Sequence, residues 1–179
     1  MENLDPPKLY TIGHSTRTIE EFLDLLKPFE IKVLTDIRRL PGSRKFPQFD
    51  QDNLKKSLEE NGIEYRYLED LGGRRKLAKT SKNTAWRNKS FQAYADYMET
   101  DAFKTAAADL AKIVENATTV IMCSEAVWWR CHRSMLSDYF KAKNWKVLHI
   151  MAPSKATEHP YTSPARVVGE EVFYSEEEA

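Results

Sequence analysis

The sequence predicts an α/β protein: a single domain with one five-stranded, mainly parallel sheet and helices on both of its faces. Two observations indicate this fold class. Five short runs rich in β-branched and apolar residues recur along the 179-residue chain, and amphipathic helical segments separate them. Strands that alternate with helices are joined by right-handed crossovers, which make the strands parallel. We expect the Rossmann-like strand order 3-2-1-4-5, with a flavodoxin-like order as the alternative.

The predicted elements follow one another in a regular order. The strands are Lys8–Ile12, Ile31–Ile37, Ile63–Leu68, Thr118–Cys123 and Trp145–Met151. The second and the fourth have the apolar, β-branched content of strands that are covered on both faces. The helices, each with apolar residues at helical spacing, are Thr18–Phe29, Asp50–Asn61, Ser90–Glu99, Asp101–Glu115 and Cys131–Lys143. Thr18 and Glu21 form a capping box at the first helix, and Gly62 ends the second.

The chain is predicted to be one domain, residues 1–179, with a core over about residues 8–166. A chain of this length with 41% apolar residues can bury a full hydrophobic core without disulfides or structural metals. Residues 71–89 form a long basic loop, because seven basic residues and no acid lie between Leu71 and Ser90. Residues 170–179 contain five glutamates and no base, and we expect a frayed acidic tail there.

The composition excludes several classes of function. Lys plus Arg and Asp plus Glu both number 27, so nucleic-acid wrapping driven by net charge is not expected. No apolar run reaches the roughly 18 residues that a membrane span needs, and the first residues lack a signal-peptide pattern. Two cysteines make no disulfide framework. We therefore expect a cytoplasmic protein without a membrane partner.

Residues that carry chemistry follow the carboxyl ends of the predicted strands. In open parallel sheets, ligands bind beyond these ends where the strand order reverses, which for the favoured order is between the first and fourth strands. All four histidines and both cysteines are expected at this rim. The candidates, in chain order, are His14, Ser15, Asp36, Arg38, Ser43, Gly72, Gly73, Arg74, Arg75, Cys123, Glu125, Cys131, His132 and Arg133, followed by His149 and His159.

Cations gather around the start of the last predicted helix, at Arg130, His132 and Arg133. Because the free N–H groups of a helix N-terminus attract negative charge, this end is a candidate anion site. The glycine pair in the basic loop would also let the backbone bend around a phosphate. The alternative is structural: Glu125 or Asp36 neutralises these cations in a buried ion pair.

The two cysteines allow two interpretations. Cys131 lies in the first turn of the last predicted helix beside cations, which lowers the pKa of a thiol as a nucleophile requires. Cys123 ends a buried strand, where a free cysteine is commonly part of the apolar core. The spacing from Cys123 to Arg130 is one residue longer than in a phosphatase-type loop. No zinc, dinucleotide or P-loop motif occurs, so neither a metal nor another cofactor is predicted.

Several motifs resemble the domain of unknown function 488 family. They are Tyr10–Ser15, Asp36-x-Arg38 with Pro41 and Ser43, Leu71–Arg75, Tyr94–Met98, and Met122-Cys123-x-Glu125 through Cys131-His132-Arg133. They occur in order between about residue 9 and about residue 166. The resemblance implies a compact, cytoplasmic, bacterial or archaeal α/β domain, and it marks site positions without assigning a reaction. Ser124 and Trp128 depart from the family pattern, where an alanine-like residue and a proline are expected.

The rim cluster and the aromatic, basic loop lead us to expect an enzyme that acts on a nucleotide or a nucleic-acid base, by hydrolysis as in repair. The residues expected to carry this are Arg38, Arg133 and 72–75 for phosphate, Glu125 or Asp36 as acid or base, Cys131 or His132 as assisting groups, and His14 as a further acid or base. Two alternatives stay open. One is a non-catalytic module that binds an anionic ligand or a partner protein, and the other is sulfur or redox chemistry at the two cysteines.

Overall fold

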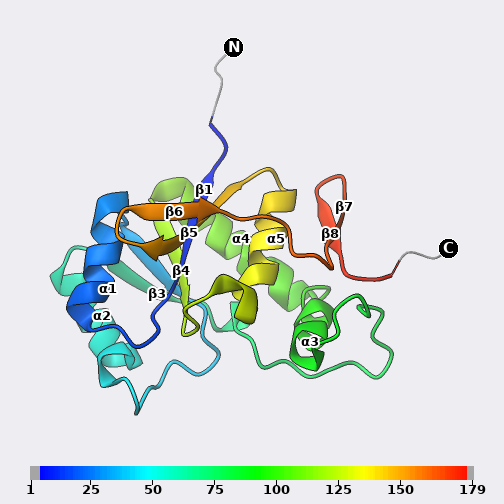
Figure 1. Cartoon of the computed structure of the whole chain (residues 1–179), viewed down its shortest axis with the longest axis horizontal. Coiled ribbons are helices and arrows are strands. Elements are labelled where there is room, and N and C mark those ends of the chain that lie inside the picture. The colour runs from blue at the N-terminus through cyan, green and yellow to red at the C-terminus, as the bar shows by residue number, and fades with distance from the viewer. Residues whose placement is uncertain (1–4, 177–179) are drawn as a thin grey trace.

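The computed structural model describes residues 5–176. These residues form a six-stranded sheet with the order β3-β2-β4-β1-β5-β6 and a separate two-stranded sheet (Figure 1). The large sheet contains β1 (Lys8–Gly13), β2 (Val33–Asp36), β3 (Glu64–Tyr67), β4 (Thr119–Cys123), β5 (Lys146–Ala152) and β6 (Lys155–Glu158). β1 to β5 are parallel and correspond to the five predicted strands, whereas β6 runs antiparallel to β5.

The strand order differs from both predicted orders because β4 inserts between β2 and β1. All five residues of β4 are buried, whereas β1 begins with an exposed lysine. A strand without a polar side is stable only where helices cover both faces and neighbouring strands pair with both edges. β1 and β4 nevertheless remain neighbours, with Gly13 opposite Cys123, so their carboxyl ends meet as predicted.

Three strands have no counterpart among the predicted elements: β6, β7 (Arg166–Val168) and β8 (Glu171–Phe173). β6 carries a lysine and a glutamate and is largely exposed, as is typical of an edge strand. It therefore lacks the alternation of apolar and polar residues by which a strand is predicted. β8 lies within the acidic segment 170–179, and Tyr174 beside it is buried. The prediction of a frayed tail is therefore wrong for this part, and residues 177–179 lie outside the described residues.

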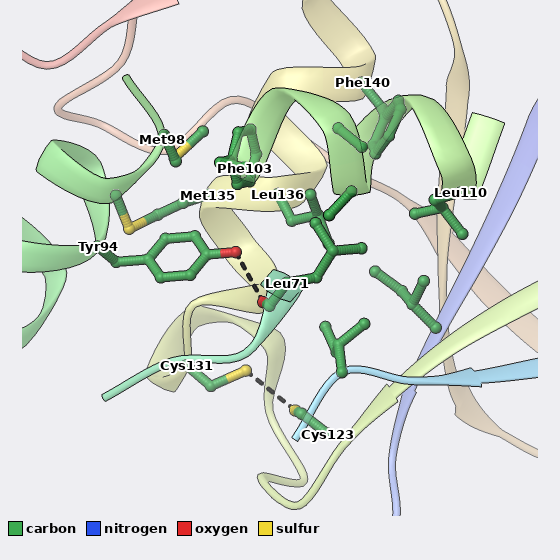
Figure 2. Packing of buried hydrophobic residues seen from close by; sticks show 14 of the residues in the cluster. Leu71, Tyr94, Met98, Phe103, Leu110, Cys123, Cys131, Met135, Leu136 and Phe140 are labelled. Atoms are coloured by element: carbon green, nitrogen blue, oxygen red, sulfur yellow. Dashed lines mark hydrogen bonds between the residues drawn. The ribbon is translucent and has the colours of Figure 1, made fainter. Parts of the chain in front are cut away.

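Helices cover both faces of the large sheet (Figure 1). α1 (Ile19–Leu26) and α2 (Gln51–Glu60) share one apolar cluster with the sheet, and α3 (Lys89–Tyr97), α4 (Asp101–Asn116) and α5 (Arg133–Ala142) share the other. Side chains alternate along β4 between these clusters, so that Ile121 and Cys123 face the second one. Figure 2 shows Cys123 at the edge of this second cluster. Within residues 5–176, every helix falls short of the length and apolar character that crossing a membrane requires.

Local signals set the ends of the first two helices. Thr18 Oγ1 accepts from the Glu21 N–H at 3.1 Å, and Glu21 Oε1 accepts from the Thr18 N–H at 2.9 Å, which confirms the capping box. Gly62 follows α2 with φ of +76°, a conformation that glycine adopts without strain.

Residues 72–88 contain no helix or strand, yet the segment is held firmly against α3. Asp96 of α3 accepts hydrogen bonds from the Ala78 N–H at 3.0 Å, Ser81 Oγ at 2.5 Å and Asn83 Nδ2 at 2.7 Å. The Tyr94 hydroxyl donates to the Leu71 carbonyl at 2.8 Å where this loop begins (Figure 2). α3 thus fixes the basic loop beside the carboxyl ends of the strands.

Candidate functional site

A cleft of about 820 Å³ opens beyond the carboxyl ends of β1, β2 and β4. Segments far apart in the sequence converge on it: the turns after these three strands, the basic loop, α3 and the segment before α5. Its predicted lining residues are His14, Ser15, Arg38, Ser43, Gly73, Arg74, Cys123, Glu125, Cys131 and His132. The location is the one that the arrangement of a parallel sheet predicts.

The turn after β1 is locked to the turn after β4. The His14 N–H donates to the Cys123 carbonyl at 2.9 Å, and the Ser15 N–H donates to the Ser124 carbonyl at 3.0 Å. A Cβ atom on Gly13 would lie 1.6 Å from the Glu125 carbonyl oxygen, so only glycine fits there. This close approach explains the glycine, and the two backbone bonds set His14 and Ser15 at the cleft.

His14 lines the cleft as a neutral imidazole. Its Nδ1 lies 2.8 Å from the Ser15 carbonyl oxygen, which only accepts, so Nδ1 carries the proton. Its ring stacks on Phe49 with centroids 4.3 Å apart. Burial, together with the nearby Arg38 charge, lowers the pKa of His14 to about 4. At neutral pH Nε2 therefore has a free lone pair to accept a proton.

Asp36 supports the cleft from beneath and does not line it. The Arg38 guanidinium donates to both of its oxygens, from Nε at 2.9 Å and from Nη2 at 2.8 Å. The Tyr65 hydroxyl adds a bond at 2.6 Å, and Arg38 Nη1 donates to the Phe49 carbonyl at 2.7 Å. Asp36 has no exposed surface. These bonds fix Arg38 and occupy both oxygens of Asp36, which was predicted as an acid or base and lies outside the cleft lining.

The two cysteines form a close pair on the cleft floor. Their Sγ atoms lie 3.0 Å apart, and both thiols are free and buried (Figure 2). Burial opposes ionisation of Cys123, but a hydrogen bond from Cys131 and the positive charge of Arg133 outweigh it and lower the pKa of Cys123 to about 7. Burial and the adjacent Cys123 sulfur raise the pKa of Cys131. The surroundings thus favour ionisation of Cys123 over ionisation of Cys131.

Arg133 is a buried cation without a carboxylate partner among residues 5–176. Its exposed fraction is 1%, its Nε and Nη1 atoms have no hydrogen-bond partner, and its Nη2 is 3.5 Å from the Ala126 carbonyl. Neither of the predicted partners, Asp36 and Glu125, pairs with it: Asp36 binds Arg38, and Glu125 is exposed. Arg133 does not itself line the cleft, but its backbone N–H donates to Cys131 Sγ of the thiol pair at 3.2 Å.

The N-terminus of α5 does not offer free N–H groups, which corrects the predicted anion site there. The Arg133 N–H donates to Cys131 Sγ at 3.2 Å, the Ser134 N–H to the Cys131 carbonyl at 3.1 Å, and the Met135 N–H to the His132 carbonyl at 3.0 Å. The turn that precedes the helix therefore consumes its first donors.

His132 forms part of the cleft wall. Its ring packs against Tyr94 with centroids 4.9 Å apart, and a Cβ atom on Gly73 would lie 3.0 Å from its Nδ1. Burial lowers the pKa of His132 to about 4, and its Nε2 has no hydrogen-bond partner. The glycine pair thus serves close packing, because a Cβ atom on Gly72 would lie 2.8 Å from the Arg39 Cα.

Other candidates lie outside the cleft lining. Arg75 donates to the Gly72 and Glu69 carbonyls at 2.9 Å each and stacks on Tyr97, so its guanidinium is occupied. Gly72 is buried beneath the loop.

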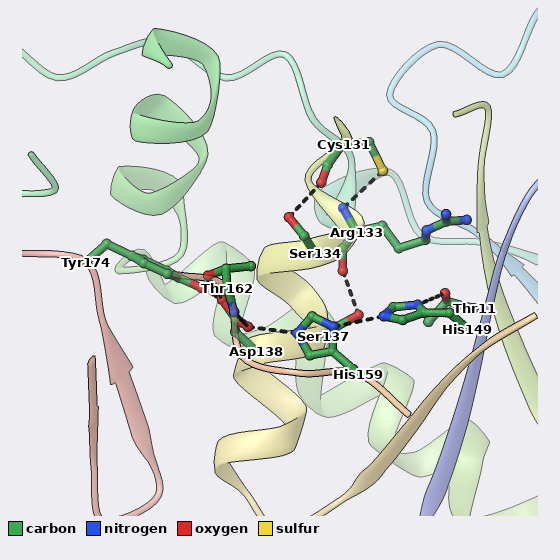
Figure 3. A network of polar contacts seen from close by, with 10 residues as sticks. All are labelled: Thr11, Cys131, Arg133, Ser134, Ser137, Asp138, His149, His159, Thr162 and Tyr174. Carbon is green, nitrogen blue, oxygen red and sulfur yellow. Dashed lines mark hydrogen bonds and ion pairs between the residues drawn. The ribbon is translucent and has the colours of Figure 1, made fainter. Parts of the chain in front are cut away.

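The expectation that all four histidines share the rim is wrong for two of them. His149 lies opposite Thr11 in the middle of β5, and His159, which follows the antiparallel strand β6, packs beside it, so neither lines the cleft at the rim. Figure 3 shows them in a buried chain that runs from Thr11 through His149 and His159 to Asp138.

Arg130, predicted as one of the cations near the start of α5, also lines the cleft. The structure adds lining residues that the sequence analysis did not select as candidates: Thr16, Arg39, Leu40, Gly42, Lys45, Phe46, Ser90, Phe91, Tyr94, Ser124 and Ala126. Phe91 and Tyr94 lie on the apolar side of α3, where periodicity predicts core, and only the position of α3 at the mouth of the cleft brings them to the site. For segment 38–46, the sequence did offer an indication of a binding role, because basic residues and a phenylalanine lie close together there.

Metal-ligating residues do not converge in the part of the chain that the structure describes. No group of three or more His, Cys, Asp or Glu side chains there is arranged to hold a metal ion. The site therefore consists of a thiol pair, a neutral imidazole and cationic walls.

Comparison with protein families matches residues 18–140 to the family described as Domain of unknown function DUF488. No curated protein matches the chain, and no solved structure does. The matched segment runs from the N-cap of α1 into α5 and includes Arg38, both cysteines and His132. Since the match covers more than half of the 179 residues and the motifs of the cleft fall largely within it, the chain belongs to the DUF488 family.

Proposed function

We propose that the protein is an enzyme that binds a nucleotide, or one nucleotide of a single strand, in the cleft and hydrolyses a bond within it. The observation that carries this proposal is the charge of the lining. Among the described residues that line the cleft, five are cationic and one, Glu125, is a carboxylate. A phosphate group would neutralise this excess of positive charge.

The cations differ in how much charge they have left for a ligand. Arg38 is neutralised by Asp36, and Arg39 Nε lies 3.9 Å from Glu69 Oε1. The remaining three, Lys45, Arg74 and Arg130, are exposed and form no ion pair with another described residue. They are the groups that we assign to phosphate binding.

Size and aromatic content favour a single nucleotide over a duplex. A volume of about 820 Å³ is in the range of small-molecule sites, roughly 300–1,000 Å³. Phe46 and Phe91 border the cleft and are half-buried, so part of each ring is available for stacking on a base.

The chemistry that we assign to this cleft is general base catalysis by His14. Its Nε2 takes a proton from water, and the resulting hydroxide attacks the electrophilic atom of the bond that breaks. The imidazolium then returns this proton to the leaving group, which balances the reaction. The neutral state of His14 at pH 7 follows from its lowered pKa of about 4.

Calorimetric titration tests the binding step. We expect adenosine monophosphate to bind more tightly than adenosine, and its affinity to fall as the salt concentration rises. Arg74→Gln should weaken binding of the monophosphate about threefold to tenfold, because one charge-assisted hydrogen bond is lost. Lys104→Gln, on the exposed side of α4 and outside the cleft, is the matched control.

Turnover separates an enzyme from a binding module. Nucleotides and short single strands, incubated with the protein, would be analysed by chromatography for released base or phosphate. His14→Gln should abolish product formation while keeping nucleotide affinity within about threefold. Salt-dependent binding without any product would instead favour the non-catalytic module, and equal affinity for adenosine and its monophosphate would reject the phosphate site.

A further inference from the structure

The floor of the same cleft holds a pair of free thiols that the proposed nucleotide hydrolysis does not use. We propose that Cys123 and Cys131 form a catalytic dithiol that reduces a small, negatively charged disulfide bound in the cleft. The geometry that supports this is the 3.0 Å separation of the two Sγ atoms, both from residues that line the cleft. The two sulfurs come from separate elements, the end of β4 and the turn before α5, so the fold itself brings them together.

Arg133 is the independent observation that distinguishes this pair from two core cysteines. Its side chain is 1% exposed, and its Nε and Nη1 atoms have no hydrogen-bond partner among the described residues. Its backbone N–H donates to Cys131 Sγ at 3.2 Å, which ties Arg133 to the thiol pair. A buried cation without a counter-charge is unfavourable, and a thiolate on Cys123 supplies that charge. An apolar cysteine pair would leave the cation unexplained.

Each sulfur has its own polar support. Cys131 Sγ accepts the Arg133 N–H at 3.2 Å, and the Cys123 thiol, while protonated, donates to the Glu125 carbonyl at 3.8 Å. These contacts hold both sulfurs at the same place on the floor, below the cationic walls. A disulfide bond is about 2.05 Å long, so closing the pair requires a shift of about 1 Å.

The reaction proceeds in two exchange steps. The Cys123 thiolate attacks one sulfur of the substrate disulfide, so that a Cys123–substrate disulfide forms and the other substrate half leaves as a thiolate. Cys131 then gives its proton to that thiolate and attacks Cys123 Sγ, which releases the second half as a thiolate that takes a proton from water. The substrate gains two electrons, and the protein ends as a Cys123–Cys131 disulfide that an external dithiol must reduce.

The order of the steps follows from the surroundings of Cys131. Burial and the Cys123 sulfur keep Cys131 protonated while Cys123 is a thiolate. Once Cys123 is in a mixed disulfide, the repulsion between the two sulfur charges is gone and Cys131 ionises more readily. The second thiol is therefore activated only after the first has reacted.

The walls of the cleft select the charge of the substrate. Lys45, Arg74 and Arg130 would attract a disulfide that carries carboxylates and repel one that carries ammonium groups. Glutathione disulfide and cystamine are probes of these two kinds, and comparing them tests the charge of the substrate separately from the thiol chemistry.

Mass spectrometry of the full-length, reduced protein after exposure to glutathione disulfide tests the proposal. The wild-type protein should lose two hydrogen atoms and keep no adduct. Cys131→Ser should retain one glutathione on Cys123, because the second step is blocked. Cys123→Ser should react with glutathione disulfide at about one tenth of the wild-type rate or more slowly, because the remaining thiol is protonated at neutral pH. Circular dichroism and the urea midpoint of each variant establish that it is folded.

The role of Arg133 has its own readout. Arg133→Met should shift the pH profile of Cys123 alkylation by iodoacetamide to higher pH, whereas Arg133→Lys should retain most of the wild-type profile. The pH profile of Cys123→Ser alkylation shows which part of the signal belongs to Cys131.

Three results would overturn the proposal: a folded Cys131→Ser protein that forms no adduct, a wild-type protein oxidised no faster than Cys123→Ser, or cystamine reacting as fast as glutathione disulfide. No nucleotide is present in any of these experiments. Their failure would therefore leave the nucleotide proposal standing, and a failure of nucleotide binding would leave the dithiol proposal standing.

Discussion

A hydrogen bond that is shut off from solvent joins Asp138 of α5 to His159: Oδ1 lies 2.8 Å from Nε2, and neither side chain has exposed surface. Asp138 also accepts from the Thr162 N–H at 3.0 Å, from the Thr162 hydroxyl at 2.5 Å and from the Tyr174 hydroxyl at 2.7 Å (Figure 3). One carboxylate thus joins α5 to the segment after β6 and to the residue after β8. We interpret this cluster as the anchor of the C-terminal part of the chain.

Replacing Asp138 should be among the most destabilising single changes. Asp138→Ala leaves buried donors on His159, Thr162 and Tyr174 without an acceptor, and we expect it to lower the free energy of unfolding by about 3–5 kcal/mol. Urea unfolding followed by circular dichroism measures this. Asp109→Ala, exposed on α4, is the matched control and should change the free energy by less than about 0.5 kcal/mol. A loss below about 1 kcal/mol at Asp138 would show that the network is not an anchor.

Most of the fold could be predicted because its signals are local. The five parallel strands and the five main helices lie close to their predicted positions, since periodicity and caps such as Thr18 and Gly62 depend on neighbouring residues. The strand order could not be predicted from local signals. The insertion of β4 between β2 and β1 depends on how the complete set of strands and helices packs. β6 was missed because an exposed edge strand lacks the apolar pattern.

The candidate site shows the same division. His14, Cys123 and Cys131 follow or end predicted strands, or begin a helix, and topology places such residues at one rim. His149 shows where this reasoning fails. It lies in the middle of β5, opposite Thr11, and not at the carboxyl end of the strand. Its position along the strand depends on the pairing register, which composition does not reveal. The free charge of Arg133 was equally hidden, since a sequence does not tell which carboxylate pairs with which cation.

Acid should destabilise the protein through its buried histidines. Burial lowers the pKa of His14 and His132 from 6.5 to about 4 in each case. In the unfolded chain both bind protons below pH 6.5, whereas the folded chain binds them only near pH 4. Stability is therefore complete above pH 6.5 and falls as the pH drops toward 4, by up to about 3 kcal/mol for each histidine.

Urea unfolding at pH 7.5 and pH 5.0 measures this loss. The wild-type protein should be less stable at the lower pH, and His132→Gln should reduce the difference between the two values. A difference that is the same in the wild-type protein and in His132→Gln would show that His132 does not contribute to the pH dependence.

Gly13 should tolerate no side chain. A methyl group there would lie 1.6 Å from the Glu125 carbonyl oxygen, so Gly13→Ala must push apart the turns after β1 and β4. We expect a loss of about 3 kcal/mol or more in the free energy of unfolding, and weaker nucleotide binding because His14 and Ser15 shift. At Gly42 the nearest atom to an added Cβ is Asp50 Oδ1 at 3.6 Å, so Gly42→Ala is the matched control and should cost less than about 1 kcal/mol. Similar losses from the two substitutions would contradict the packing described for Gly13.

Asp96 should decide whether the basic loop stays in place. Its two oxygens accept from Ala78 N–H, Ser81 Oγ and Asn83 Nδ2, and the loop itself contains no helix or strand. Asp96→Ala removes these acceptors while the substituted position remains on a helix, so we expect the loop to open locally and the rest of the fold to persist. Limited digestion with trypsin, which cleaves after lysine and arginine, should then cut at Lys76, Lys79 or Lys82 about tenfold faster, while the urea midpoint changes little. Asp109→Ala again serves as the control. If the digestion rate stays at the wild-type value, the contacts of the loop with the rest of α3, including the bond from Tyr94 to Leu71, must be sufficient to hold it.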